Sequence, residues 1–181
     1  LPMGWTGVTS GMPAALGGPG WGWGAQLLTN LEQAPLRDTT RFDLPIVSAS
    51  NELVRTAELT VFLCPTDGSG SSWRLTGARL SSVRISRSNY VGAFGSEGWD
   101  AKAASRVGVT LEGDGVFYHN SSTHFVDIID GLSGTVLAGE RVSDVMANRR
   151  STWVGVVPGV ENAIARVVGT GETTPGKPSK R

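Results

Sequence analysis

The sequence holds few side chains whose type and spacing could support catalysis. It has two histidines, His119 and His124, which lie five residues apart on either side of Asn-Ser-Ser-Thr. This spacing fits neither the H-E-x-x-H zinc pattern nor two histidines one helical turn apart. The chain also lacks a G-x-S-x-G nucleophile motif, a G-x-G-x-x-G loop and a G-x-x-x-x-G-K-[ST] loop. We therefore expect no enzymatic activity and assign no catalytic or cofactor-binding residue.

Acidic side chains next to glycines suggest metal binding as a second kind of chemistry. Asp67 and Asp114 lie in Asp-Gly turns rich in oxygen ligands, and they are the candidate calcium ligands. Neither turn continues into an EF-hand loop with its distal glutamate, and tight turns prefer Asp-Gly for purely structural reasons. His124, Asp127 and Asp130 form another possible metal group, for which surface or helix-cap roles are the simpler explanation. No cofactor other than calcium is expected.

The block DIIDGLSGTVLAGE predicts local structure more strongly than chemistry. Asp127 can cap a short helix that ends at the Asp-Gly pair starting with Asp130. Ser133 and Thr135 can then bond to the nearby backbone. Glu140 ends an apolar strand that we expect to be buried. An unpaired carboxylate would be unfavourable there, so we expect a partner for it.

The pattern of apolar residues predicts the elements that would position these side chains. Turn formers such as Pro65 and the Asp-Gly pairs mark the ends of the elements. The expected domain runs over residues 26–168, between an uncharged segment at 1–25 and a flexible basic tail at 169–181. From apolar periodicity we expect a helix at 23–33, strands at 59–64, 80–91, 107–115, 135–140 and 151–159, and a helical turn at 125–129.

Composition and charge narrow the class of protein. Sixteen basic and sixteen acidic residues cancel, so the net charge does not indicate binding to nucleic acid. A charged fraction of 18%, with 25 glycines and 9 prolines, favours a turn-rich α+β protein outside the cytoplasm over a helical bundle. One cysteine excludes an internal disulfide.

The first 31 residues carry no charge, yet three prolines and eight glycines would break a membrane-spanning helix there. We expect irregular chain on a surface, with Trp5, Trp21 and Trp23 as anchors. These tryptophans have two possible roles. Trp21 and Trp23 can pack against the missing helix or a neighbouring subunit, or, with Trp73 or Trp99, they can stack on sugars and make the chain a secreted polysaccharide-binding module.

Five ordered blocks resemble a known family: WGWGAQLLTNLEQ, FLCPTD, SNYVGAFG, the long block at 115–140, and a tryptophan at 153. This is the prepilin-like "domain of unknown function" family of planctomycete-type bacteria, related to type IV pilins and pseudopilins. The resemblance covers about residues 21 to 155. Its matching positions are Trp21, Trp23, Glu32, Gln33, Cys64, Pro65, Asp67, Asn89, Tyr90, Gly92, Asp127, Asp130, Gly131, Ser133, Thr135 and Glu140.

The sequence departs from the family pattern at Thr29, Leu132 and Gly134, and it lacks both the N-terminal cleavage signal with its apolar helix and the C-terminal H-x9-D-G block. The resemblance implies a pilin-like globular head with an antiparallel sheet. It also implies a structural subunit of an extracellular filament, or of a periplasm-facing pseudopilus. Its partners would be copies of itself and the pilus or secretion machinery, and it would meet the membrane only through the absent helix.

The same resemblance bears on Cys64, because family members often carry another cysteine near the end of the N-terminal helix. It implies a disulfide between Cys64 and that cysteine in an oxidising compartment. The alternative is a small hydrophobic residue packed in the domain.

Overall fold

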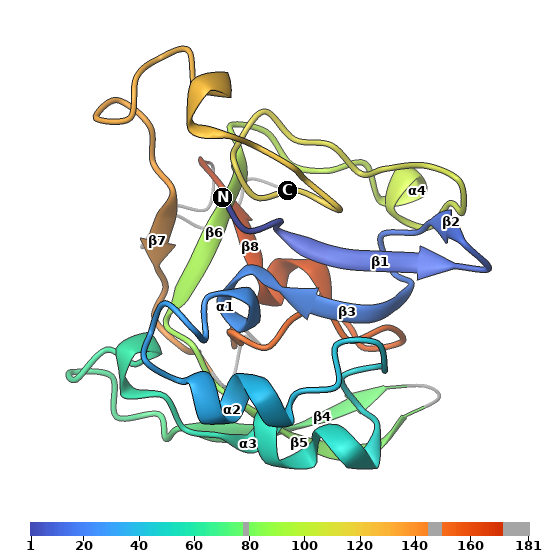
Figure 1. Cartoon of the computed structure of the whole chain (residues 1–181), viewed down its shortest axis with the longest axis vertical. Helices are drawn as coiled ribbons and strands as arrows, with labels where there is room; N and C mark the ends of the chain where they lie inside the picture. Colours follow the sequence, from blue (N-terminus) through green and yellow to red (C-terminus); the bar gives the residue numbers. More distant parts are fainter. Residues whose placement is uncertain (78–79, 145–149, 172–181) are drawn as a thin grey trace.

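The computed structural model describes residues 1–77, 80–144 and 150–171, which form three small sheets joined by short helices (Figure 1). The predicted α+β class is confirmed, although one parallel strand pair makes the third sheet mixed. The sheets have the orders β2-β1-β3, β4-β5 and β7-β6-β8. The elements are β1 Trp5–Thr9, β2 Met12–Pro13, β3 Gly18–Gly22, α1 Trp23–Gln26, α2 Ala34–Thr39, η1 Ala49–Asn51, α3 Glu52–Thr56, η2 Thr60–Phe62, β4 Ser72–Gly77, β5 Leu80–Ser86, β6 Tyr90–Gly95, α4 Ala101–Ala104, η3 Phe125–Asp127, β7 Ala138–Glu140, η4 Ile164–Arg166 and β8 Val168–Thr170.

The N-terminal segment is part of the core, which corrects the expectation of a surface segment. Its strands β1 and β3 pair antiparallel in the middle of the molecule (Figure 1). Trp5 and Trp21 are fully buried and Trp23 is 6% exposed. These large rings can be buried without a free-energy penalty for their polar groups, because each indole N–H donates a hydrogen bond. The three acceptors are the backbone carbonyls of Ala15 for Trp5 at 2.8 Å, Leu44 for Trp21 at 3.2 Å and Val167 for Trp23 at 3.1 Å.

Glycines between the tryptophans let a distant part of the chain approach. A Cβ atom on Gly22 would lie 2.9 Å from the Cα of Gly155, and one on Gly24 would lie 2.7 Å from the carbonyl oxygen of Trp153. The amide of Gly22 also donates to the carbonyl of Val154 at 2.8 Å. The predicted strand at 151–159 is therefore buried chain held by isolated bridges, without a regular ladder.

Several other predicted elements differ from the structure. The helix expected at 23–33 is regular only in α1, and the backbone turns away where Glu32 takes a φ of +60°. The strand expected at 59–64 is the short 3-10 helix η2. No strand occupies 107–115 within the described chain. The strands expected in 80–91 appear as β5 and the start of β6, and the helical turn at 125–129 appears as η3.

The third sheet brings the C-terminal part of the described chain back to the centre. Strand β8 runs parallel to β6, so residues 169 and 170 belong to this sheet and not to the flexible tail that we expected from residue 169 onward. The rest of that prediction, residues 172–181, lies outside the described residues. No described helix combines the length and apolar character needed to cross a bilayer.

Candidate functional site

Two of the sequence motifs, FLCPTD and SNYVG, meet at one buried ion pair. Asp67 follows η2, and Asn89 lies between β5 and β6, 22 positions along the chain. The Asp67 Oδ2 atom accepts from Asn89 Nδ2 at 2.6 Å and lies 2.9 Å from Arg87 Nη1. The side chains of Arg87 and Asp67 are only 4% and 8% exposed. The family motif residues therefore form a structural junction between distant segments.

The surroundings of Asp67 favour its charged form. The backbone N–H of Ser143 donates to Oδ2 at 3.0 Å, and Ser69 donates to Oδ1 through its N–H at 3.0 Å and its hydroxyl at 2.5 Å. Burial by itself raises the pKa of Asp67, but the hydrogen bonds from Ser69, Ser143 and Asn89 outweigh it and hold this pKa well below the usual range. The carboxylate thus ties three parts of the chain together.

Asn89 extends the junction to both sides. Its Oδ1 accepts from the Cys64 backbone N–H at 2.9 Å, and its own backbone N–H donates to the carbonyl of Phe62 at 2.7 Å. Its carbonyl accepts from the Arg141 N–H at 2.6 Å. Asn89 therefore binds position 64 through its backbone amide, a bond that does not depend on the cysteine side chain.

The thiol of Cys64 is half-buried and free, with its Sγ 3.1 Å from Thr66 Oγ1. Pro65, next to it, is exposed. The pairing with a cysteine outside this sequence stays a prediction.

Calcium binding at Asp67 is disfavoured by this geometry, because its oxygens already accept from several donors and face a guanidinium. Among the described residues, no three His, Cys, Asp or Glu side chains come together as a metal group would require. Sequence reasoning missed Arg87 and Ser143. Arg87 lies two positions before Asn89, so alternation along an extended chain was a usable signal. Ser143 contributes its backbone N–H, which no side-chain pattern reveals.

His119 has a structural role at the centre of the N-terminal sheet. Its ring is fully buried and stacks on Trp5, with ring centroids 5.6 Å apart. Nδ1 accepts from the Leu111 N–H at 3.2 Å, and Nε2 lies 2.8 Å from the carbonyl of Gly7, which requires the proton on Nε2. Burial lowers the pKa of His119, opposed by the bond to Gly7. His124, in contrast, is exposed.

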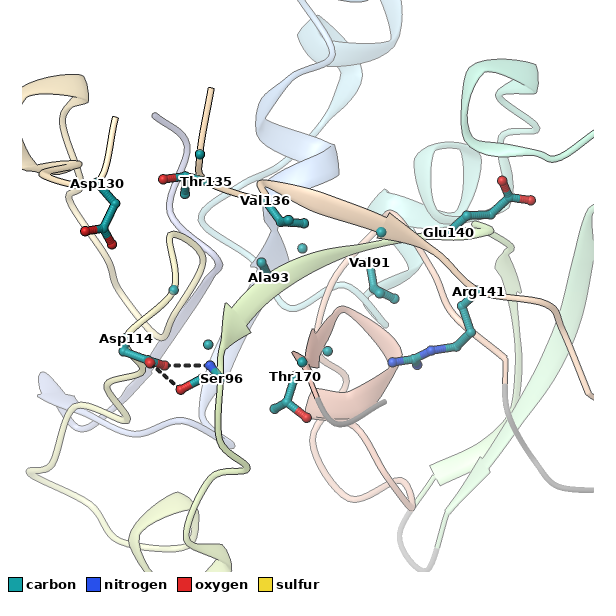
Figure 2. Close-up of a pocket in the computed structure, with 17 residues that line it drawn as sticks. Val91, Ala93, Ser96, Asp114, Asp130, Thr135, Val136, Glu140, Arg141 and Thr170 are labelled. Carbon is teal, nitrogen blue, oxygen red and sulfur yellow. Dashed lines mark hydrogen bonds between the residues drawn. The ribbon is translucent and has the colours of Figure 1, made fainter. Parts of the chain in front are cut away.

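A cavity of about 420 Å³ lies between the third sheet and the loop before β7 (Figure 2). Glycines form much of its wall, including Gly92 of the SNYVG motif. Asp114 and Asp130 lie on one side of it and Arg141 on the other (Figure 2). Ser96 donates to Asp114 from its hydroxyl at 2.5 Å and its N–H at 2.8 Å, and these bonds lower the pKa of Asp114. Calcium at Asp114 stays a prediction.

In the DIIDGLSGTVLAGE block, Asp127 makes a capping bond from the last position of η3, although the N-cap residue is His124, and the predicted burial is wrong. Asp127 Oδ2 accepts from the His124 N–H at 2.7 Å, and Thr135 donates to the Gly131 carbonyl at 3.0 Å. The strand β7 is exposed throughout. Glu140 is therefore in solvent, and its side chain has no ion-pair partner within the described residues, so the expected partner was wrong.

The remaining candidate residues are dispersed. Trp21 and Trp23 lie in the core, where they cannot stack on sugars, and Trp73 and Trp99 are half-buried. Glu32 is exposed, Gln33 precedes α2, and Tyr90 opens β6. The motif positions that lie on the exposed loop beside the cavity are Asp130, Gly131, Ser133 and Thr135.

The longest exposed apolar stretch in the described chain coincides with this block. We call residues 125–142 the apolar segment; it contains β7, and the loop before β7 projects from the molecule above that strand (Figure 1). Its large exposed side chains are Phe125, Val126, Ile129, Leu132, Val136, Leu137 and Val142, with exposed fractions from 36% to 92%. Monomeric proteins seldom expose so many large apolar side chains in one stretch.

Comparison with known proteins gave one match. Neither the curated proteins nor the solved structures contain a chain similar enough to count as a relative. The model of one family, described as "Protein of unknown function (DUF1559)", matches residues 1–172. The chain therefore belongs to the DUF1559 family.

Proposed function

We propose that this chain is the globular head of a pilin-like structural subunit that assembles with copies of itself outside the cytoplasm. The observation that carries the proposal is the apolar segment 125–142. Its side chains lie in water in the single chain, and contact with other subunits would bury them, with a gain of roughly 25 cal/mol for each Å² of apolar surface removed from water.

The rest of the molecule supports a role in assembly over one in chemistry. The motif residues Asp67 and Asn89 are engaged in the buried junction with Arg87, where they hold the fold together. The block with the exposed apolar side chains belongs to the same family pattern. The family pattern thus contains buried residues, which stabilise the fold, and exposed residues, which are available for contacts between subunits. An assembling subunit needs both kinds.

The proposed setting is an extracellular filament or a periplasm-facing pseudopilus. An apolar N-terminal helix of the kind that the family resemblance implies would provide the membrane anchor and the filament core. The heads would pack side by side around it, and the pilus or secretion machinery would be the other partner.

The test compares self-association of the chain with that of two surface variants. Val126 and Ile129, 86% and 92% exposed, lie in the apolar segment, whereas Leu53 and Val61, 63% and 55% exposed, lie elsewhere. We expect the double variant Val126→Glu with Ile129→Glu to abolish self-association, measured by sedimentation velocity. In the intact protein, the same variant should abolish filaments, observed by electron microscopy. The matched variant Leu53→Glu with Val61→Glu should keep both. Equal behaviour of the two variants would refute the proposal.

A further inference from the structure

The outer edge of β7 has no partner strand in residues 1–77, 80–144 and 150–171. β7 bonds to β6 on one side, and no other strand of the described chain pairs with it. Figure 1 shows β7 at the rim of the molecule, below the projecting loop. Such an edge offers a row of free backbone donors and acceptors to another strand.

The ladder with β6 fixes which backbone groups point outward. The Arg141 N–H donates to the Asn89 carbonyl at 2.6 Å, and the Leu137 carbonyl accepts from the Ala93 N–H at 2.9 Å. Because bonding direction alternates along a strand, Leu137, Gly139 and Arg141 face β6. The backbone groups of Ala138 and Glu140 therefore face outward.

Two exposed valines flank this edge symmetrically. Val136 and Val142 lie three residues on either side of Gly139, and they are 69% and 66% exposed. An antiparallel pair of two copies related by a twofold axis at Gly139 would place Val136 of each opposite Val142 of the other. It would also place the outward groups of Ala138 opposite those of Glu140.

The neighbouring registers are less favourable. A twofold axis at Glu140 would put two glutamates directly opposite each other, and like charges in that position destabilise a pair of strands. An axis at Ala138 would place Val142 opposite Gly134, which has no side chain to cover it. An axis between two residues would match outward groups with inward ones.

We propose that the β7 edge binds the same edge of a second copy of this chain, as an antiparallel strand pair centred on Gly139. The pairing deepens the proposed function, on which it rests, because it names one surface through which two heads meet. It is isologous and closes on two copies, so a filament would need a further contact elsewhere.

The geometry supplies a direct chemical test at Gly139. In the centred register the two Gly139 residues form a non-hydrogen-bonded pair, with Cα atoms about 4.5 Å apart, and a disulfide spans about 4.4 to 6.8 Å. A Cβ atom at Gly139 meets no atom within 4 Å, so cysteine fits there. The native Cys64 is first replaced in Cys64→Ser, which leaves the introduced thiol as the only one.

We expect Gly139→Cys to form a disulfide-linked dimer about tenfold faster than a control thiol, since pairing raises the effective concentration of the two groups. Gly98→Cys is the control on a different exposed loop, where a Cβ atom is equally unobstructed. Ala138→Cys is the register control, because Ala138 would face Glu140 of the second copy and not itself. Both controls should cross-link slowly under mild oxidation.

The outcomes separate this inference from the proposed function. If Gly139→Cys cross-links no faster than Gly98→Cys while sedimentation still shows association, the strand pairing is wrong and homotypic assembly stands. If the chain with Cys64→Ser stays monomeric in sedimentation at every concentration and Gly139→Cys does not cross-link, both fail. Equal rates for Gly139→Cys and Ala138→Cys would reject the centred register.

Discussion

The N-terminal segment 1–25 and the apolar segment 125–142 are the two most instructive regions of the molecule, because their sequences suggest the opposite of their environments. The first is uncharged and rich in glycine, and we expected it to pack on a surface. It lies in the core, where Trp5 and Trp21 are fully buried. The second contains the apolar stretch that we expected to form a buried strand, and it is exposed. Apolar composition alone therefore does not decide which segment lies inside.

The difference comes from partners supplied at a distance. The N-terminal tryptophans find acceptors for their indole N–H groups, and the neighbouring glycines Gly22 and Gly24 let the backbone at 153–155 come close. The apolar segment has local bonds, such as that from Thr135 to Gly131, and a short ladder to β6. Local bonds shape a loop without covering its side chains.

The largest expected effect is on the buried side of this comparison. Trp23→Ala should lower the free energy of unfolding by about 3–5 kcal/mol, because it removes a large ring and leaves a cavity. Ile129→Ala, at a side chain 92% exposed, should change it by less than about 0.5 kcal/mol. Urea denaturation followed by tryptophan fluorescence and circular dichroism measures both. Similar losses for the two variants would mean that the apolar segment is packed in solution.

A smaller loss is expected at the junction that joins the two family motifs. Asp67→Asn should destabilise the fold by about 3 kcal/mol, because it leaves the guanidinium of Arg87 buried without its counterion. The matched control is Asp43→Asn, whose ion pair with Arg41 is largely in solvent. The control should melt at the unchanged temperature. If Asp67→Asn also melts unchanged in calorimetry, the junction does not hold the motifs together.

The smallest effect is a pH dependence from His119. Its pKa in the folded protein is lowered from the usual 6.5, so below this pH the unfolded chain binds more protons than the folded one. The contribution of His119 to the free energy of unfolding should be fully present above about pH 6.5. Below that pH the free energy of unfolding should fall, with a slope of at most about 1.4 kcal/mol per pH unit for one proton. Asp67, with its lowered pKa, should add a further loss below about pH 4.

Two variants separate the contribution of His119 to the pH dependence from the contributions of other titratable groups. His119→Gln removes the buried ring and should flatten the stability curve between pH 6.5 and 5, whatever its effect at neutral pH. His124→Gln, at a side chain 77% exposed, should keep the wild-type curve. Thermal melts from pH 4 to 8 would contradict the assignment if the two variants gave the same slope.

Sequence reasoning located the local features of this protein and missed those that depend on distance. The cap at Asp127, the strands in 80–91 and the α+β class follow from residue types over a few positions. The strand predicted at 59–64 is a 3-10 helix, in which the N–H groups of Phe62 and Leu63 donate to the carbonyls of Leu59 and Thr60. The next amide, that of Cys64, donates to the side chain of Asn89, 25 positions away. Arg87 was missed for a similar reason, since its role depends on a carboxylate in another loop.

What the sequence determined by itself was membership of the DUF1559 family and the α+β class of fold, because these depend on residue order and local propensity. Only the tertiary structure decided that the uncharged beginning forms the core and that the block 125–142 lies on the surface. The physical reason is that burial is a property of contacts between distant segments. A tryptophan is inside when a carbonyl and a glycine from elsewhere meet it, and neither can be read at its own position.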